Sequence, residues 1–156
     1  MHANDLRFTV AAEIREIANR FLSPKPRSLA IFGSFAGGSL HETSDIDILL
    51  IGDDIPHKPY DKTTWFSPLR EHWRATQKAL YPTCPKALSP LVLPSSAWMD
   101  SIGLRLSLSS SCWVLWDDGV ISFALEEARA WIRSGRWRKK DLPRGGWVWI
   151  PKEQVA

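Results

Sequence analysis

Residues 31–34 (Ile-Phe-Gly-Ser) and residues 45–50 (Asp-Ile-Asp-Ile-Leu-Leu), ten residues further on, indicate both the fold and the chemistry of this chain. Residues two apart on a strand project to the same face. Asp45 and Asp47 therefore project together, while Ile46 and Ile48 face the core. Two adjacent carboxylates repel each other and require a counter-charge, which a divalent cation supplies. Because Mg²⁺ favours one or two protein carboxylates, completed by water and substrate phosphates, the pair predicts a Mg²⁺ site.

The Gly33-Ser34 step predicts a phosphate-binding turn. A glycine directly after a buried strand lets the backbone turn sharply and approach a ligand closely. Backbone N–H groups in such a turn, or at the start of a short helix, attract phosphate oxygens, and the Ser34 hydroxyl adds a donor. Together with Asp45 and Asp47, this turn can hold a polyphosphate at one end and its metal at the other. Nucleotidyl transfer requires both charge neutralisation and in-line positioning.

The pattern of Gly33-Ser34, a ten-residue gap and Asp45-x-Asp47 resembles the polymerase-β-like nucleotidyltransferase superfamily, in particular its minimal, stand-alone members. The resemblance covers roughly residues 5–95. It implies that Asp45 and Asp47 are catalytic metal ligands for Mg²⁺, with two ions accompanying the nucleotide. It also implies that Gly33 and Ser34 contact the phosphates of a nucleoside triphosphate, ATP being the expected substrate.

The chain departs from the family pattern in its third carboxylate. Family members often carry an acid on a later strand, where it completes the metal site and acts as a base. The expected strand 87–93 contains no acid, and the next candidates are Asp100, Asp117 and Asp118. His41 and Glu42 lie in the loop between the two motifs, where exposed loop positions are the simpler explanation. The domain is therefore expected to bind a nucleotide. Without a third carboxylate, it would transfer the nucleotide slowly or not at all.

The remaining pattern predicts an α+β fold, a mixed sheet flanked by helices. Pro68 is expected in the first turn of its helix, and Pro90 indicates an edge strand or a bulge. The expected elements are a helix over 5–22, strands over 28–32 and 45–51, a helix over 67–81, a strand over 87–93, a helix from Ser95 or Ser96 to about 107, an apolar run at 112–116, a turn at 117–119 and a helix over about 121–134.

Composition indicates one globular domain. The chain has 156 residues, of which 44% are hydrophobic and 24% charged, a balance that suits a soluble globular protein. We expect a single domain over residues 1–156, with a core of about 5–95 and a C-terminal extension of about 96–156. Cys84 and Cys112 form no CxxC pair and are expected as buried thiols. The chain shows neither a signal peptide nor a membrane-length apolar run, which predicts a cytoplasmic protein without a membrane role.

Basic residues gather between 133 and 144, where six Arg and Lys residues face one acid, Asp141. The net charge of +3 does not by itself indicate a nucleic-acid binder. Cations interleaved with Trp131 and Trp137 suit nucleic acid, an acidic partner or the triphosphate. A solvated helix end is the favoured explanation, because cations near a helix C-terminus are stabilised by its dipole. Trp147 and Trp149 alternate as in a strand and are expected to pack against the domain.

Three functional hypotheses follow. The first is an enzyme that transfers a nucleoside monophosphate, AMP from ATP, to a hydroxyl of a small molecule or a protein. The second follows from the resemblance, because minimal nucleotidyltransferases of this kind often resemble antitoxins paired with an all-helical RNase of the HEPN type. The third is a degenerate module that binds a nucleotide without turnover. The acceptor, the base preference and the oligomeric state stay open at this point.

Overall fold

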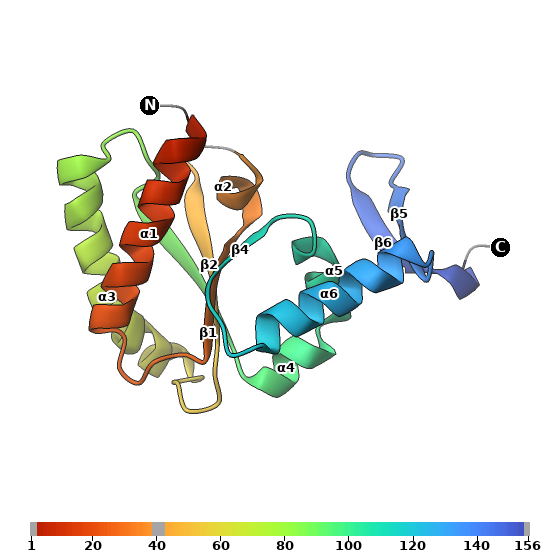
Figure 1. Ribbon diagram of the computed structural model, residues 1–156, viewed down its shortest axis with the longest axis horizontal. Coiled ribbons are helices and arrows are strands. Elements are labelled where there is room, and N and C mark those ends of the chain that lie inside the picture. Colours follow the sequence, from red (N-terminus) through yellow and green to blue (C-terminus); the bar gives the residue numbers. More distant parts are fainter. Residues whose placement is uncertain (1–2, 39–42, 155–156) are drawn as a thin grey trace.

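The computed structural model describes residues 3–38 and 43–154. A four-stranded sheet in the order β3-β2-β1-β4 forms its centre (Figure 1). β1 (Ser28–Phe32) runs antiparallel to both β2 (Asp45–Ile51) and β4 (Cys112–Trp116), and β2 runs parallel to β3 (Ala87–Leu93). The sheet is therefore mixed, as the α+β pattern predicts. β3 is an edge strand, which confirms the interpretation of Pro90.

Helices cover both faces of the sheet, and each face has its own hydrophobic core. α1 (Ala3–Phe21) and α3 (Pro59–Leu80) cover one face, where Ile46 and Ile48 are fully buried. α4 (Ser95–Asp100), α5 (Ile102–Leu108) and α6 (Val120–Arg133) cover the other, against Leu49 and Ile51. Figure 1 shows the two layers on either side of the sheet. Because alternate residues face opposite ways, Asp45 and Asp47 belong to the face of Leu49 and Ile51.

The first helix and the three strands 28–32, 45–51 and 87–93 have the expected positions, and α3 differs. It begins at Pro59, eight residues before the expected start, so Pro68 lies inside the helix and not in its first turn. Pro59 stands at the first helical position, where its fixed φ suits a helix start. The first turns of α3 are largely exposed and carry no apolar stripe, which is why periodicity missed them. Leu80, the last residue of α3, is exposed as well.

The segment after β3 also differs in detail from the prediction. The expected single helix is broken at Ser101 into α4 and α5. Neither Ser95 nor Ser96 caps α4, because Pro94 is the N-cap residue and the Ser95 hydroxyl bonds to Asp53 instead. Asp117-Asp118-Gly119 forms the expected turn before α6. Phe123, a candidate core residue of that helix, is 64% exposed.

The C-terminal segment contains a hairpin, of which the sequence indicated only the strand-like alternation of Trp147 and Trp149. β5 (Trp137–Asp141) pairs antiparallel with β6 (Trp147–Pro151), and this hairpin is a separate two-stranded sheet that extends from the end of α6 (Figure 1). A short 3₁₀ turn, Lys152–Gln154, follows, and α2 (Gly33–Gly37) connects β1 with the loop to β2. Cys84 and Cys112 are free thiols, as expected. Across the described residues, every helix is too short or too polar to cross a membrane.

Candidate functional site

The two sequence motifs meet at one end of the sheet. Phe32, the last residue of β1, pairs with Asp47 near the start of β2. Gly33 and Ser34 follow Phe32 directly and open the short helix α2. The antiparallel pairing therefore brings the Gly-Ser turn beside the two aspartates, although ten residues separate them along the chain.

Gly33 and Asp47 are in direct contact. Gly33 has a φ of 71°, in the left-handed region that favours glycine. A Cβ atom at this position would overlap the Asp47 carboxylate, so any side chain at Gly33 would displace it. The next residue, Ser34, is exposed. The absence of a side chain at Gly33 thus lets the turn and the carboxylate lie close enough to contact one ligand.

The two carboxylates differ in their surroundings. Asp45 is exposed, whereas Asp47 is partly buried between β1 and β3. Burial raises the pKa of Asp47 above its ordinary value, the charge of Asp45 raises it further, and a hydrogen bond from the Ser89 side chain partly opposes the rise. Asp47 thus carries a charge that its surroundings disfavour, and a bound cation would relieve that cost.

The residues present fit a bound Mg²⁺ ion with part of its coordination supplied by the substrate. Within residues 3–38 and 43–154, no group of three or more His, Cys, Asp or Glu could hold a metal. Asp45 and Asp47 can supply two oxygen ligands, and a Mg²⁺ site commonly takes the rest from water and phosphate. Exposed Asp45 and Ser34 leave the site open to such a ligand.

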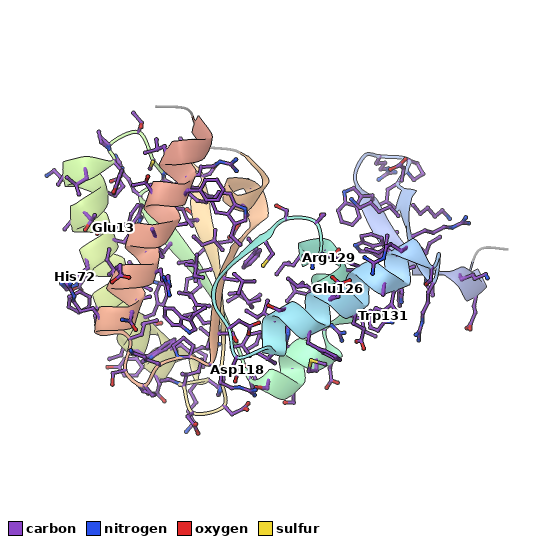
Figure 2. The ribbon with its side chains drawn as sticks, viewed as in Figure 1. Glu13, His72, Asp118, Glu126, Arg129 and Trp131 are labelled. Carbon is purple, nitrogen blue, oxygen red and sulfur yellow. The ribbon has the colours of Figure 1, made fainter. Side chains whose placement is uncertain are left out.

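The structure excludes Asp117 and Asp118 as the third carboxylate. Asp117 accepts a hydrogen bond from Ser28, the first residue of β1, and so lies at the opposite end of the sheet from Gly33. Asp118 pairs with Arg27 at 2.6 Å at that same end, and Figure 2 shows it there. Asp100 is exposed at the end of α4. His41 and Glu42 lie outside the described residues.

Ser89 takes the place beside the aspartates where an acid was sought. In the parallel pairing of β2 with β3, Asp47 is opposite Ser89, and the two side chains are hydrogen-bonded. The sequence could not indicate this contact, because it depends on which strand pairs with β2 and in which register.

Arg7 supports the Gly-Ser turn from α1. Its guanidinium donates to the carbonyl oxygens of Phe35 at 3.0 Å and Ala36 at 3.3 Å, at the end of α2, and lies over the Trp113 ring. A cation satisfies helix carbonyl groups that would otherwise lack a donor. A sequence signal did exist, because Arg7 falls three residues before the buried Val10 on the apolar stripe of α1.

Arg129 places a cation on the face of the sheet to which the aspartates project. Its Nε donates to the Ser109 carbonyl at 2.9 Å, and its charge lowers the pKa of nearby Cys112. Burial nevertheless dominates and raises the pKa of Cys112 to about 12, so this thiol is not a nucleophile at neutral pH. Figure 2 shows Arg129 on α6 on the side of the α5–β4 connection.

A known family model spans both sequence motifs. Residues 12–78 match the family model described as a nucleotidyltransferase domain. A search of curated proteins gave no match. Among solved structures, the chain is similar to a toxin-antitoxin complex with AMP-PNP, at 17% identity over 79% of this chain and 87% of that chain, with a TM-score of 0.47.

Two further solved structures are similar to a comparable degree. One is a mutant of the toxin-antitoxin pair MntA-HpeT, at 15% identity over 86% of this chain and 89% of that chain, with a TM-score of 0.45. The other is a tri-AMPylated Shewanella oneidensis HEPN toxin in complex with an MNT antitoxin, at 15% identity over 82% of this chain and 87% of that chain, with a TM-score of 0.46.

Proposed function

We propose that this chain transfers AMP from ATP to a hydroxyl group of an acceptor, because residues 12–78 match the nucleotidyltransferase domain model. In this proposal Asp45 and Asp47 hold Mg²⁺, and Gly33 and Ser34 contact the phosphates of the nucleotide. When bound, Mg²⁺ neutralises charge on the phosphates and on the departing pyrophosphate. Residues 96–156 act as an extension of the same domain.

The proposed transfer is a single displacement. The acceptor oxygen attacks the α-phosphorus, and the bond from that phosphorus to the oxygen that bridges to the β-phosphate breaks. Pyrophosphate leaves with the electron pair of that bond, and the acceptor proton passes to solvent. Asp45 and Asp47 would hold the metal ion that accompanies the nucleotide, and the N–H groups of the turn at Gly33 and Ser34 would hold phosphate oxygens.

One observation supports the proposal most: Gly33 and Asp47 touch at the end of the sheet, so the turn at Gly33 and Ser34 lies against a carboxylate. A single polyphosphate can contact both. The raised pKa of Asp47 supports the same conclusion, because a buried carboxylate beside a second one is stabilised by a cation.

Thermal stabilisation by ATP with and without Mg²⁺ tests the site. At ligand concentrations about a hundred times Kd, binding should raise the melting temperature by about 5–10 °C. The Asp45→Asn, Asp47→Asn variant should lose this shift. The matched control is Asp54→Asn, Asp61→Asn, which removes two exposed carboxylates elsewhere. A shift that survives in the site variant, or that does not need Mg²⁺, would contradict the proposal.

A second candidate function is nucleotide binding without turnover, and Ser89 is the observation that favours it. With a hydroxyl beside Asp47 instead of a carboxylate, the site lacks a base for the acceptor hydroxyl among the described residues. This candidate predicts a saturable, Mg²⁺-dependent thermal shift with no pyrophosphate release. Measurable release that depends on Asp45 and Asp47 would eliminate it.

A partner-binding, antitoxin-like role is the third candidate. Phe8 is 63% exposed and stacks on Trp113 of the edge strand β4. These side chains form an apolar surface that a HEPN-type helical protein could cover. A short helical open reading frame beside this gene would favour the role. Co-expression with its product should then give a complex that Phe8→Ser weakens and that the control Phe123→Ser, an exposed change on α6, does not.

A further inference from the structure

The β5–β6 hairpin presents aromatic and cationic side chains on one face. The register pairs Lys139 with Trp149 and Trp137 with Pro151, and alternation places Trp147 on the same face. The Trp147 and Trp149 rings meet edge to face with centroids 5.7 Å apart, and the Lys139 ammonium lies 4.2 Å from the Trp147 ring centroid. Trp147 is 43% exposed, so it does not pack against the domain as the sequence suggested.

A pocket of about 400 Å³ lies between this hairpin and the body of the domain. The hairpin contributes Trp137, Arg138, Lys139 and Trp149; the body contributes Ser109, Ser110, Ile132 and Gly135. The indole Nε1 of Trp149 is buried and has no hydrogen-bond partner among the described residues. A buried N–H donor without a partner is costly. The hairpin thus gives the pocket two aromatic residues, Trp137 and Trp149, and two cationic residues, Arg138 and Lys139.

The cations of the hairpin are not neutralised within the described part of the chain. Arg138, Lys140 and Arg144 are exposed, and no carboxylate there forms an ion pair with them. In contrast, Arg133 at the end of α6 pairs with Glu126 at 2.9 Å. The solvated helix end that we expected from the sequence explains the position of Arg133. It does not explain the cations of the hairpin, which have no acidic partner among the described residues.

The pocket lies on the side of the sheet to which Asp45 and Asp47 project. That face is covered by α5 and α6, and the hairpin extends from α6 (Figure 1). Ser110 lines the pocket, and the hydroxyl of the next residue, Ser111, lies 3.3 Å from the position of a Cβ atom at Gly37, in the helix that begins at Gly33. The connection between α5 and β4 thus borders the pocket and also the phosphate-binding helix.

We propose that the hairpin binds single-stranded nucleic acid. Bases would stack on the exposed Trp147 ring and enter the pocket between Trp137 and Trp149. Arg138, which lines the pocket, would meet phosphates there, and the exposed Lys140 and Arg144 would meet phosphates where the strand leaves the aromatic face. Unpaired bases are required, because paired bases offer no free ring faces for stacking. An acidic protein could also neutralise these cations, but it would not explain why tryptophan side chains line the pocket.

Fluorescence anisotropy with labelled RNA and DNA oligomers of about 12 nucleotides tests this binding, with a duplex of the same length as comparison. We expect single strands to bind more tightly than the duplex, and the affinity to fall steeply between about 50 and 200 mM salt. The RNA and DNA arms identify the preferred strand. Tight binding of polyglutamate in competition with the strands, or the absence of strand binding at the lowest salt, would overturn the proposal.

Two sets of variants separate local contacts from net charge. Arg138→Gln, Lys140→Gln, Arg144→Gln should weaken binding by roughly tenfold or more and flatten the salt dependence. The matched control, Arg15→Gln, Arg74→Gln, Lys78→Gln, removes the same charge from α1 and α3, on the other face of the sheet, and should retain binding. Equal losses in both sets would overturn the proposal.

The aromatic contribution needs its own variant. Trp147→Leu replaces the exposed indole ring with a smaller apolar side chain. We expect roughly a tenfold loss of single-strand affinity with an unchanged melting temperature. Binding should also quench tryptophan fluorescence in the wild type, and less so in this variant. Full affinity and full quenching in Trp147→Leu would contradict the stacking role.

Discussion

Gly33 leaves the space that the Asp47 carboxylate fills. Gly33 follows the last residue of β1, Asp47 lies on the antiparallel neighbour β2, and Gly33 has a positive φ where a Cβ atom would overlap that carboxylate. The proposed phosphate-binding turn and the proposed metal ligand are therefore coupled sterically, because a side chain at Gly33 would displace the Asp47 carboxylate. This coupling gives the site its most specific test.

The Gly33→Ala variant should lose the Mg²⁺-dependent stabilisation by ATP. The added methyl group would displace Asp47, and the backbone strain would cost about 1–3 kcal/mol of folding free energy. Gly135→Ala is the matched control, because Gly135 has a φ of 74° and a Cβ atom there meets nothing within 4 Å. The control should share the strain and keep the ATP shift. Loss of the shift in both variants would assign the effect to backbone strain alone.

Asp47→Asn should stabilise the protein in the absence of ligands while it abolishes the ATP shift. Because the folded-state pKa of Asp47 is raised, its ionisation costs stability, and the cost appears as the pH rises through that pKa. We expect a rise of about 1–2 °C in the melting temperature at pH 7. Melting curves from pH 4 to pH 8 should show a smaller loss of stability with rising pH in the variant. A lower melting temperature at pH 7 would contradict this account.

Asp117 should show the opposite pH dependence. Burial would raise the pKa of its carboxyl group, but hydrogen bonds from Ser28, Ser122 and the Ile121 N–H outweigh it and lower the pKa to about 2. Its contribution is therefore present above the ordinary pKa and is lost as the pH falls toward 2. Asp117→Asn should cost about 2 kcal/mol at pH 7 by urea unfolding and leave the ATP shift intact. An equal cost at pH 2.5 would contradict the charge-based explanation.

Arg7→Met should reduce the ATP shift from a distance. The variant removes the donor to the Phe35 and Ala36 carbonyls and should cost about 2 kcal/mol of folding free energy. Because α2 begins at Gly33, its loosened end should also weaken phosphate binding. Arg15→Met, on the exposed side of the same helix, is the control and should change little. A destabilised Arg7→Met variant with full ATP affinity would show that Arg7 stabilises the fold only.

The sequence predicted the strands of the site well, because their signals are local. The strands that contain Ala30, Leu49 and Leu91 are short apolar runs bounded by turn residues, and the spacing of Gly33 and Asp47 indicated that they meet. The functional roles of Gly33, Ser34, Asp45 and Asp47 remain predictions.

The features that were missed depend on tertiary pairing. The contact of Ser89 with Asp47 follows from the parallel register of β3, which no local pattern specifies. The hairpin was missed because β5 is almost wholly exposed and buries no apolar stripe. Its pairing is set by the turn over 142–146, where Gly145 and Gly146 adopt positive φ. The start of α3 was missed for the same reason, since its first turns face solvent.

Ser89→Asp should strengthen Mg²⁺ binding and increase pyrophosphate release. The new carboxylate would stand beside Asp47 and supply a third oxygen ligand and a base. In a titration of Mg²⁺ at fixed ATP, followed by thermal shift, we expect roughly a tenfold lower midpoint. The protein without ligands should be less stable, because three carboxylates repel one another. Ser89→Asn, similar in size and neutral, should show neither effect. An unchanged midpoint in Ser89→Asp would mean that the side chain at 89 does not reach the metal.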